Sequence, residues 1–506
     1  MTPPPATSFD ALLGDWAKLA PDRPLLRWFS PGAPVHEDDA RWRLSGPGLV
    51  AQVDAVAAHL SRLGVQAGDR VAWLGLNHPA QIALLVALAR LGGVLVPMNH
   101  RLSPAEWGAL LEDCTPRLLL HDAHFADAAQ ALCVPTLAVS ALEAHADTPV
   151  RPAIGDARSQ PVLLVYTSGT TGRPKGAVHT QGNLLANMAI AAQVQAMTPA
   201  DAVLSVLPLF HVGGLCIQTL PALSVGAPVF LFTRFDAAAT LACIREERPT
   251  LTLQVPATLQ ALVGHPEWPQ TDLASLRAVW AGSSVLPAPL IEACHARGVP
   301  VCNVYGSTET GPFSIALSEA QAFDHVGSCG WPAPGVEVRL RRSDGETVAQ
   351  GEVGEILVRG PNVVSRYWPD LPACDAEGFF HSGDLAMQLP DGSHTVVGRA
   401  KDMVISGGEN IYPAEIENLL VQHPLVAECA VVGQDDARWG EVVVAVVVLR
   451  DPAQADWAPA LQAFLDGRLA RYKWPRRWHS VEALPRTALG KVQKPALKAL
   501  LQAPAG

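Results

Sequence analysis

The sequence predicts an α/β protein, in which a large N-terminal domain of mixed parallel sheets with helices and a barrel-like region precedes a small α+β C-terminal domain. Two patterns support this prediction. Strand-like and helix-like segments alternate over residues 9–150 and 200–305, as they do where helices cover a mostly parallel sheet. Glycine and proline turns then become frequent from residue 326 to 397, where short strands are typical of an antiparallel or barrel-like region.

A smaller unit with two helical and two strand-like segments follows Gly398. The predicted domains are therefore residues 1–398 and 399–506. Helical periodicity predicts helices over these ranges: 51–63, 80–91, 414–422 and 458–470. Apolar runs bounded by turn residues predict strands over these ranges: 70–76, 95–97, 118–121, 161–165, 202–207, 228–232, 251–255, 278–281, 301–304, 336–340, 354–358, 427–432 and 442–449.

Composition excludes several classes of protein. A hydrophobic share of 49% with 17% charged residues is typical of a globular chain, and the net charge of −11 gives no support to nucleic-acid or anionic-membrane binding. The nine cysteines form no Cys-x-x-Cys pair, and no apolar run approaches the ~18 residues of a membrane span. The first residues do not resemble a signal peptide. We expect a cytoplasmic protein without a membrane span.

The segment Tyr166–Gly176 is the most informative part of the chain. It follows a predicted buried strand and reads Tyr-Thr-Ser-Gly-Thr-Thr-Gly-Arg-Pro-Lys-Gly. Hydroxyls, glycines and backbone N–H groups in such a loop can surround phosphate oxygens, and Lys175 adds a positive charge. The spacing differs from a Walker A loop, because Pro174 stands where Gly-Lys-Ser/Thr is required. The alternative interpretation is an ordinary surface loop.

This loop resembles the phosphate loop of adenylate-forming (AMP-binding) enzymes, a superfamily of acyl- and aryl-CoA synthetases, peptide-synthetase adenylation domains and luciferases. Further matches follow in the family's order, at Tyr305–Glu309, Ser382–Asp384, Gly398–Asp402 and Pro485–Lys491. A separate string, Ser406-Gly-Gly-Glu-Asn-Ile-Tyr-Pro413, resembles the CoA-ligase branch, which includes fatty-acid–CoA and 4-chlorobenzoate–CoA ligases.

The resemblance implies an acid–CoA ligase that uses ATP, Mg²⁺ and coenzyme A. The acid and ATP would give acyl-AMP and pyrophosphate, and CoA would then displace AMP. Because an anion must approach a polyanion, the chemistry needs cations and oriented donors. A stand-alone enzyme that loads a carrier-protein phosphopantetheine is the alternative, and a luciferase-like oxidase would share the same motifs. A homodimer is left open.

The resemblance also implies roles for single residues. Lys491 would be the adenylation lysine on a mobile C-terminal domain, Thr308 would donate to the α-phosphate, and Glu309 would bind Mg²⁺. Asp384 would hold the ribose hydroxyls with Arg399 beside it. The nucleotide and its phosphates would also contact these residues: Thr167, Ser168, Gly169, Thr170, Thr171, Gly172, Lys175, Tyr305 (stacked on adenine), Gly306 and Ser307.

CoA would pass Gly408 in a pantetheine tunnel and meet Trp439, with Arg438, Tyr472, Arg476 and Arg90 as further candidates for its nucleotide. Residue His211 would gate the acid pocket, although a buried structural histidine is the simpler interpretation. Residues 256–263 contain no arginine to pair a second carboxylate. An apolar aliphatic or aromatic monocarboxylic acid is therefore expected.

Overall fold

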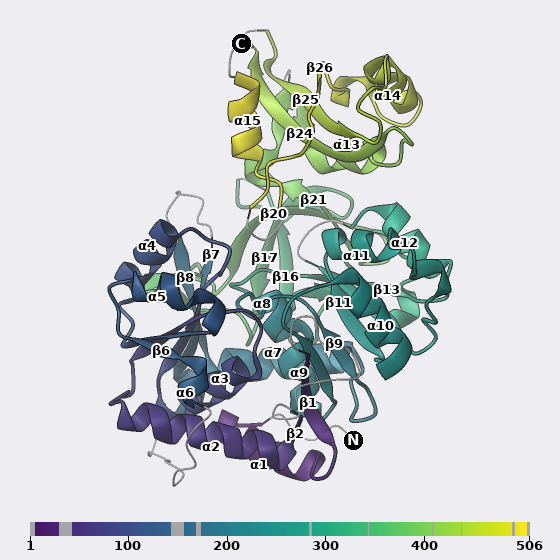
Figure 1. Cartoon of the computed structure of the whole chain (residues 1–506). Helices are drawn as coiled ribbons and strands as arrows, with labels where there is room; N and C mark the ends of the chain where they lie inside the picture. Colours follow the sequence, from purple (N-terminus) through teal and green to yellow (C-terminus); the bar gives the residue numbers. More distant parts are fainter. Residues whose placement is uncertain are drawn as a thin grey trace.

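The computed structural model describes residues 6–29, 43–142, 156–167, 174–282, 286–342, 344–406, 409–436, 438–487 and 491–502. Two large sheets, each with a parallel centre, form the main body, and helices α7 and α8 lie between them (Figure 1). A third, antiparallel sheet connects this body to a smaller C-terminal domain, which stands at the top of Figure 1. The predicted α/β class, with a large N-terminal and a smaller C-terminal domain, is confirmed.

The first large sheet has eight strands in the order β19-β18-β8-β7-β4-β3-β5-β6, and the strands from β7 to β6 are parallel. Its strands are β3 (Arg70–Leu74), β4 (Val94–Pro97), β5 (Leu118–His121), β6 (Thr136–Ala138), β7 (Pro161–Thr167), β8 (Lys175–Thr180), β18 (Arg366–Tyr367) and β19 (Leu371–Pro372).

The second large sheet has nine strands in the order β15-β14-β13-β12-β11-β9-β10-β1-β2. Its parallel strands end at one edge, where ligands bind in open α/β sheets. Its strands are β1 (Pro24–Phe29), β2 (Leu44–Ser45), β9 (Val203–Ser205), β10 (Val229–Phe232), β11 (Leu251–Gln254), β12 (Ala278–Gly282), β13 (Val301–Tyr305), β14 (Ile315–Ala316) and β15 (Trp331–Pro332).

Helix α3 (Pro79–Leu91) explains how the body is packed. Every one of its residues is buried, as expected for a helix that is apolar all round. It begins at a His78 cap and ends where Gly92 takes a left-handed conformation (φ 74°). The other α-helices of the body are α1 (Phe9–Leu19), α2 (Gly46–Arg62), α4 (Pro104–Cys114), α5 (Ala126–Gln130), α6 (Val139–Leu142), α7 (Gln181–Val194), α8 (Val212–Gly214), α9 (Leu220–Val225), α10 (Ala237–Glu247), α11 (Pro256–Val263) and α12 (Ala288–His295).

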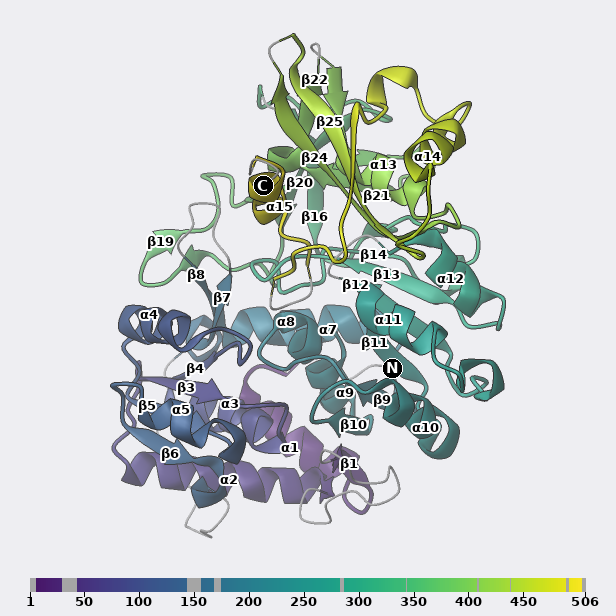
Figure 2. The same cartoon turned by 45° about the horizontal axis from the view of Figure 1, so that its top comes forward.

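The turn-rich region forms a four-stranded antiparallel sheet, β16-β17-β20-β21, as the sequence predicts. The C-terminal domain has a second antiparallel sheet, in which Figure 2 shows β22, β24 and β25. Strand β26, labelled in Figure 1, pairs with β25 in parallel. Helices α13 and α14 cover one face of that sheet, and α15 covers the other. These elements are β16 (Glu337–Arg341), β17 (Val353–Arg359), β20 (Phe380–Gln388), β21 (His394–Arg399), β22 (Val404–Ser406), β23 (Glu409–Ile411), β24 (Val426–Asp436), β25 (Gly440–Leu449), β26 (Arg477–Ser480), α13 (Pro413–Leu420), α14 (Trp457–Leu465) and α15 (Lys494–Gln502).

Several predicted elements differ from the observed ones by a few residues, and two helices differ most. The helix expected over 458–470 ends at Leu465, because Asp466 is extended and Gly467 is left-handed (φ 70°). The helix expected from residue 51 begins at Gly46, where the Ser45 hydroxyl caps it by accepting from the Gly48 amide. Within the described residues, no helix is long and apolar enough to cross a membrane. The predicted domain boundary near Gly398 stays a prediction.

Candidate active site

The turn after β13 has one tightly defined backbone path. Tyr305 ends the strand, and a Cβ atom at Gly306 would lie 1.8 Å from the carbonyl oxygen of Pro312. Only glycine fits there. The Ser307 amide then donates to the hydroxyl of Thr310 at 2.9 Å. The turn therefore holds the following two predicted site residues on a rigid base.

Those two residues, Thr308 and Glu309, are both buried. The hydroxyl of Tyr367 donates to Oε1 of Glu309 at 3.0 Å. The Lys175 ammonium lies 5.3 Å from the centre of the Tyr367 ring, over its face. Tyr367 thus connects the predicted phosphate lysine with the predicted Mg²⁺ carboxylate. Sequence reasoning missed Tyr367, because it lies outside the family's motifs and reaches the site only through the pairing of β18 with β8.

The predicted phosphate loop is anchored at both ends by antiparallel pairing. Thr167 at the end of β7 is the register partner of Lys175 at the start of β8. The Thr167 hydroxyl also donates to the Lys175 carbonyl at 3.4 Å. The intervening predicted residues lie outside the described residues: Ser168, Gly169, Thr170, Thr171 and Gly172.

Asp384 is the electrostatic centre of the site. It is register partner to Arg399, whose Nε lies 2.7 Å from Oδ1, and the Tyr305 hydroxyl donates to Oδ2 at 2.8 Å. Burial raises the pKa of Asp384, and the Arg399 charge and the Tyr305 hydrogen bond oppose that rise. Tyr305, which was expected to stack on adenine, therefore also orients the predicted ribose carboxylate.

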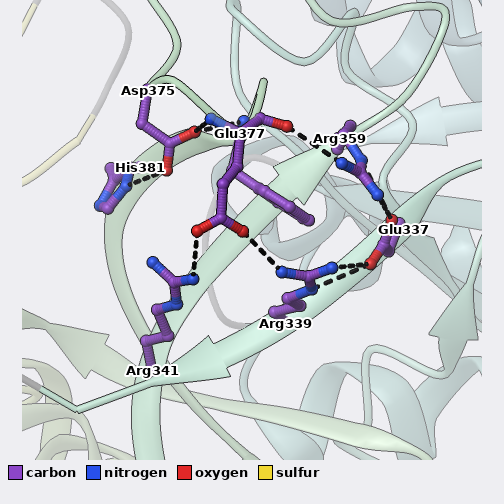
Figure 3. Close-up of polar contacts among 8 residues, drawn as sticks. Glu337, Arg339, Arg341, Arg359, Asp375, Glu377 and His381 are labelled. Atoms are coloured by element: carbon purple, nitrogen blue, oxygen red, sulfur yellow. Dashed lines mark hydrogen bonds and ion pairs between the residues drawn. The ribbon is translucent and has the colours of Figure 1, made fainter. Parts of the chain in front are cut away.

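The start of β20, just before Asp384, is braced by polar contacts. The Ser382 hydroxyl donates to the Ile356 carbonyl at 2.7 Å, and the Gly383 amide donates to Glu355 at 2.9 Å. Figure 3 shows the network of ion pairs and hydrogen bonds around this strand start, formed by Glu337, Arg339, Arg341, Arg359, Asp375, Glu377 and His381. The network fixes the strand that carries Asp384.

Lys491 of the C-terminal domain reaches this centre. Its backbone is fixed by hydrogen bonds in both directions with Thr487. Lys491 remains exposed to solvent, yet the protein around its ammonium group lowers its pKa. Partial desolvation is the largest cause and the Arg399 charge the next, while Asp384 and Glu309 oppose them. The two domains thus place Lys491 within the electrostatic reach of both predicted carboxylates.

His211 lies close enough to Lys491 to feel its charge. Burial, and to a smaller extent the charge of Lys491, lower the pKa of His211 to about 4. Nδ1 of His211 accepts from the Gly213 amide at 3.0 Å and caps α8. A neutral imidazole whose Nδ1 accepts carries its proton on Nε2. His211 is therefore uncharged at neutral pH and presents one N–H donor.

Three of the predicted CoA residues come together. The guanidinium groups of Arg438 and Arg476 lie 5.0 and 4.3 Å from the centre of the Trp439 ring. The next residue, Gly440, pairs with Ser406 at the end of β22. This cluster therefore lies beside the tip of the β22–β23 hairpin. Gly408, in that tip, lies outside the described residues.

Two other CoA candidates do not join that cluster. Arg90 is buried in the N-terminal domain, where it pairs with Asp54 and, at 2.9 Å, with Asp10. Its interpretation as a CoA contact is wrong, because a buried guanidinium with two carboxylate partners is a structural brace. Tyr472 is 46% exposed and carries the Lys473 ammonium 5.7 Å from its ring centre.

The predicted Mg²⁺ position fits the chemistry of Glu309. Mg²⁺ usually binds through one or two carboxylates together with substrate phosphates, and it keeps several waters. Across the described ranges, no three His, Cys, Asp or Glu side chains gather as an all-protein metal cage. A single buried carboxylate beside an anchored phosphate loop fits an ion that arrives with the nucleotide.

Comparisons with known proteins assign the family. Residues 14–368 match the AMP-binding enzyme model, and residues 415–491 match the AMP-binding enzyme C-terminal domain model. The chain belongs to the AMP-binding enzyme family. It is 46% identical over 478 residues to indoleacetate–CoA ligase of Aromatoleum aromaticum, covering 90% of this chain and 93% of that protein. It is 42% identical to feruloyl-CoA synthase of an Amycolatopsis species, and the match covers 88% of this chain and 91% of that protein.

A solved structure agrees over nearly the whole length. O-succinylbenzoate coenzyme A synthetase from Bacillus subtilis, in complex with ATP and magnesium ion, superposes with a TM-score of 0.85. The two chains are 32% identical, and the match covers 96% of this chain and 99% of the other. The predicted class of enzyme, an AMP-forming acid–thiol ligase, is confirmed by these relatives, as is the predicted use of ATP, Mg²⁺ and CoA.

Proposed function

We propose that this enzyme joins an aromatic monocarboxylic acid to coenzyme A at the expense of ATP. The acid carboxylate attacks the α-phosphorus of ATP, which gives an acyl-AMP and pyrophosphate. The CoA thiol then attacks the acyl carbon, which gives the acyl-CoA and AMP. The observation that carries the proposal is the pair of buried carboxylates, Asp384 held by Arg399 and Tyr305 and Glu309 held by Tyr367, with Lys491 of the C-terminal domain within their electrostatic reach.

The first half-reaction needs positive charge where two anions meet. Lys491 supplies it at the acid carboxylate and the α-phosphate, and Thr308 donates a hydrogen bond to that phosphate. Lys175 and the loop that it closes hold the departing phosphates. Glu309 binds Mg²⁺, which neutralises phosphate charge when bound.

Asp384 holds the rest of the nucleotide. Its carboxylate accepts from the ribose hydroxyls, and Arg399 and Tyr305 keep it oriented through the contacts of 2.7 and 2.8 Å. A carboxylate that accepts these bonds must be ionised. The Arg399 charge favours that ionised form against the effect of burial.

The second half-reaction uses another surface of the C-terminal domain. The Arg438–Trp439–Arg476 cluster and the β22–β23 hairpin would receive CoA, with Gly408 lining the pantetheine path. Lys491 and Trp439 lie on different segments of that domain, so they could serve the site in turn. We therefore propose that residues 399–506 rotate against residues 1–398, about a hinge at Lys401.

The acid site has an apolar character that favours an aromatic acid. Neutral His211 and the glycines that follow it leave no cation for a second carboxylate among the described residues of this segment. Burying an unpaired carboxylate costs several kcal/mol, whereas an apolar acid gains about 0.8 kcal/mol for each buried CH₂. The relatives at 46% and 42% identity are named for indoleacetate and ferulate, both aromatic.

We also propose a cytoplasmic location, which the nine free cysteines support because a reducing compartment keeps thiols unpaired. A homodimer stays a proposal that light scattering at several concentrations can test.

Acid-dependent AMP release tests the proposed function, using indole-3-acetate, ferulate, octanoate, succinate and malonate. We expect the aromatic monocarboxylates to have the highest kcat/KM. A short dicarboxylate as best substrate, or no acid-dependent AMP at all, would contradict the proposal.

A further inference from the structure

A β-bulge in β20 contains Asp384. Strands β17 and β20 pair at residues 357 and 381 and again at residues 355 and 385, so residues 382–384 of β20 lie opposite Ile356 alone. A bulge bends its strand and changes the direction of a side chain, and bulges are frequent next to active sites. The Asp384 side chain that leaves this bulge meets Tyr305 and Arg399.

Side chains replace the backbone hydrogen bonds that the bulge interrupts. The Asp384 amide donates to the Ser382 hydroxyl at 3.0 Å, and that hydroxyl donates to the Ile356 carbonyl at 2.7 Å. The Gly383 amide donates to Oε1 of Glu355 at 2.9 Å. Glu355 is therefore the side chain that connects the middle of the bulge to β17.

Gly383 is the residue of the bulge whose backbone has the most freedom. Its φ of 69° lies in the left-handed region, which glycine adopts readily and other residues rarely do. A Cβ atom at Gly383 would meet no atom within 4 Å, so the backbone angle and not a lack of space favours glycine there. Because glycine has many allowed conformations, the hydrogen bond from its amide to Glu355 selects one of them.

The Glu355 carboxylate has support of its own. Its Oε2 lies 3.6 Å from Nδ1 of His381, and Nε2 of His381 lies 3.0 Å from Asp375 (Figure 3). Asp375 in turn accepts from the amides of Glu377 and Phe379, each at 2.9 Å. The Glu355 side chain is 30% exposed, so water can replace its carboxylate in a variant, and the variant should fold.

We propose that Glu355 is a positioning residue for the ribose-binding carboxylate. Through the Gly383 amide it fixes the bulge, and the bulge sets the direction in which Asp384 presents its oxygens. The inference rests on the proposed function, in which Asp384 accepts from the ribose hydroxyls. Tyr305 and Arg399 hold the end of the Asp384 side chain, whereas Glu355 holds the backbone from which that side chain starts. A carboxylate supported at both ends discriminates between ribose and deoxyribose, because its oxygens are fixed before the nucleotide arrives.

A matched pair of nucleotides tests the inference. The nucleotide 2′-deoxy-ATP lacks one of the ribose hydroxyls that Asp384 would bind, and it is otherwise identical to ATP. We expect kcat/KM for acid-dependent pyrophosphate release by the wild-type enzyme to be at least about tenfold higher with ATP, since a site that binds a hydroxyl rejects the analogue without it. Equal kcat/KM values for the two nucleotides would overturn the ribose role of Asp384 in the proposed function, and this inference with it.

Two substitutions at one position then test the role of Glu355. Glu355→Met keeps the length of the side chain and removes the acceptor, so the ratio of kcat/KM between the two nucleotides should fall to within about threefold. Glu355→Gln keeps an oxygen that can accept from the Gly383 amide, and it should keep the wild-type ratio. Glu352→Ala is the control from the same segment, because the Glu352 carboxylate pairs with Arg342 at 3.2 Å.

Thermal unfolding shows whether each variant is folded, and Glu355→Ala is a second variant without the acceptor. A folded variant of this kind that is slower with both nucleotides but keeps the wild-type ratio would overturn the inference, because a merely structural role affects both nucleotides alike. A glutamine variant with a ratio as low as that of the methionine variant would overturn the role of the hydrogen bond to Gly383.

Discussion

Single charges decide the chemistry of this site more than any nucleophile does. Desolvation raises the pKa of the Asp384 carboxylate and lowers the pKa of the Lys491 ammonium, because it disfavours the charged form of each group. The charge of each group partly opposes the desolvation shift of the other group's pKa. The Arg399 charge favours the ionised form of Asp384 and disfavours the ionised form of Lys491. A bound anion would therefore relieve the repulsion between Lys491 and Arg399, as the proposed function requires of the nucleotide.

Lys491→Ala should lower the rate of acyl-AMP formation by about 10²–10³-fold and largely spare thioester formation from supplied acyl-AMP. The reason is that charge neutralisation between carboxylate and α-phosphate is needed only in the first step. Pyrophosphate exchange measures the first step, and single-turnover transfer to CoA measures the second. Lys494→Ala is a suitable control, because Lys494 pairs with Glu417 within the C-terminal domain. Equal losses in both steps would contradict the role.

Tyr305→Phe should move the acid limb of kcat/KM for ATP to higher pH. The Tyr305 hydrogen bond lowers the pKa of Asp384, so its removal raises that pKa further, and the carboxylate protonates earlier as the pH falls. At neutral pH we expect about a fivefold loss. Pyrophosphate exchange measured from acidic to neutral pH gives the profile, because the raised pKa of Asp384 places its titration above that of an ordinary carboxylate. An unchanged limb, with Tyr472→Phe as control, would show that Asp384 is not the titrating group.

At the scale of elements, the sequence predicted the sheets well, because short apolar runs next to glycine and proline leave few alternatives. The strand at β5 has the predicted bounds, Leu118–His121. The helix at α14 was predicted too long, since residues 466–470 have helical periodicity but Gly467 adopts a left-handed conformation. Local pattern cannot show such backbone choices, which depend on how the chain must turn to reach η8 (Arg471–Lys473).

The candidate site was predicted residue by residue from motifs, yet the links between motifs were not. Nothing local connects Tyr305 with Asp384, 79 residues away, or Tyr367 with Glu309. These contacts arise where separate sheets meet. Arg90 shows the opposite error, because it was predicted as a CoA contact from the family resemblance, whereas the structure buries it between two carboxylate partners.

Trp439→Ala should raise KM for CoA by about tenfold and leave pyrophosphate exchange unchanged. The Trp439 indole lies against two guanidinium groups, so its loss removes an aromatic contact near the expected CoA nucleotide and loosens both cations. Steady-state kinetics with varied CoA gives KM. Trp457→Ala is a control in the same domain. A normal KM for CoA in the Trp439 variant would place the CoA nucleotide elsewhere.

At the scale of the whole molecule, the C-terminal domain stands next to β20 and β21 of the main body (Figure 1). Lys491 lies within electrostatic reach of the N-terminal carboxylates, whereas the Trp439 cluster lies beside β22, on another part of the C-terminal domain. The short helical turn η7 (Ala400–Asp402) connects β21 with β22. It is the place where a change of backbone angles would turn one domain against the other.

Lys401→Pro should impair that movement, because proline fixes φ near −65°. We expect pyrophosphate exchange to be retained and overall acyl-CoA formation to fall by about tenfold or more. Lys401→Ala is the matched control, since it removes the charge but keeps φ free. Wild-type turnover in the proline variant, with small-angle scattering showing two populated arrangements, would contradict a hinge at this residue.

Transfer of the acyl group to coenzyme A is the step that distinguishes this proposed ligase from a carrier-loading enzyme. It is tested most directly by mass spectrometry of the products formed from indole-3-acetate and ATP, with CoA and with a phosphopantetheine-loaded carrier protein as competing acceptors. We expect one acyl-CoA for each AMP released and little acylated carrier. Acylated carrier as the main product, or AMP release without any thioester, would contradict this expectation.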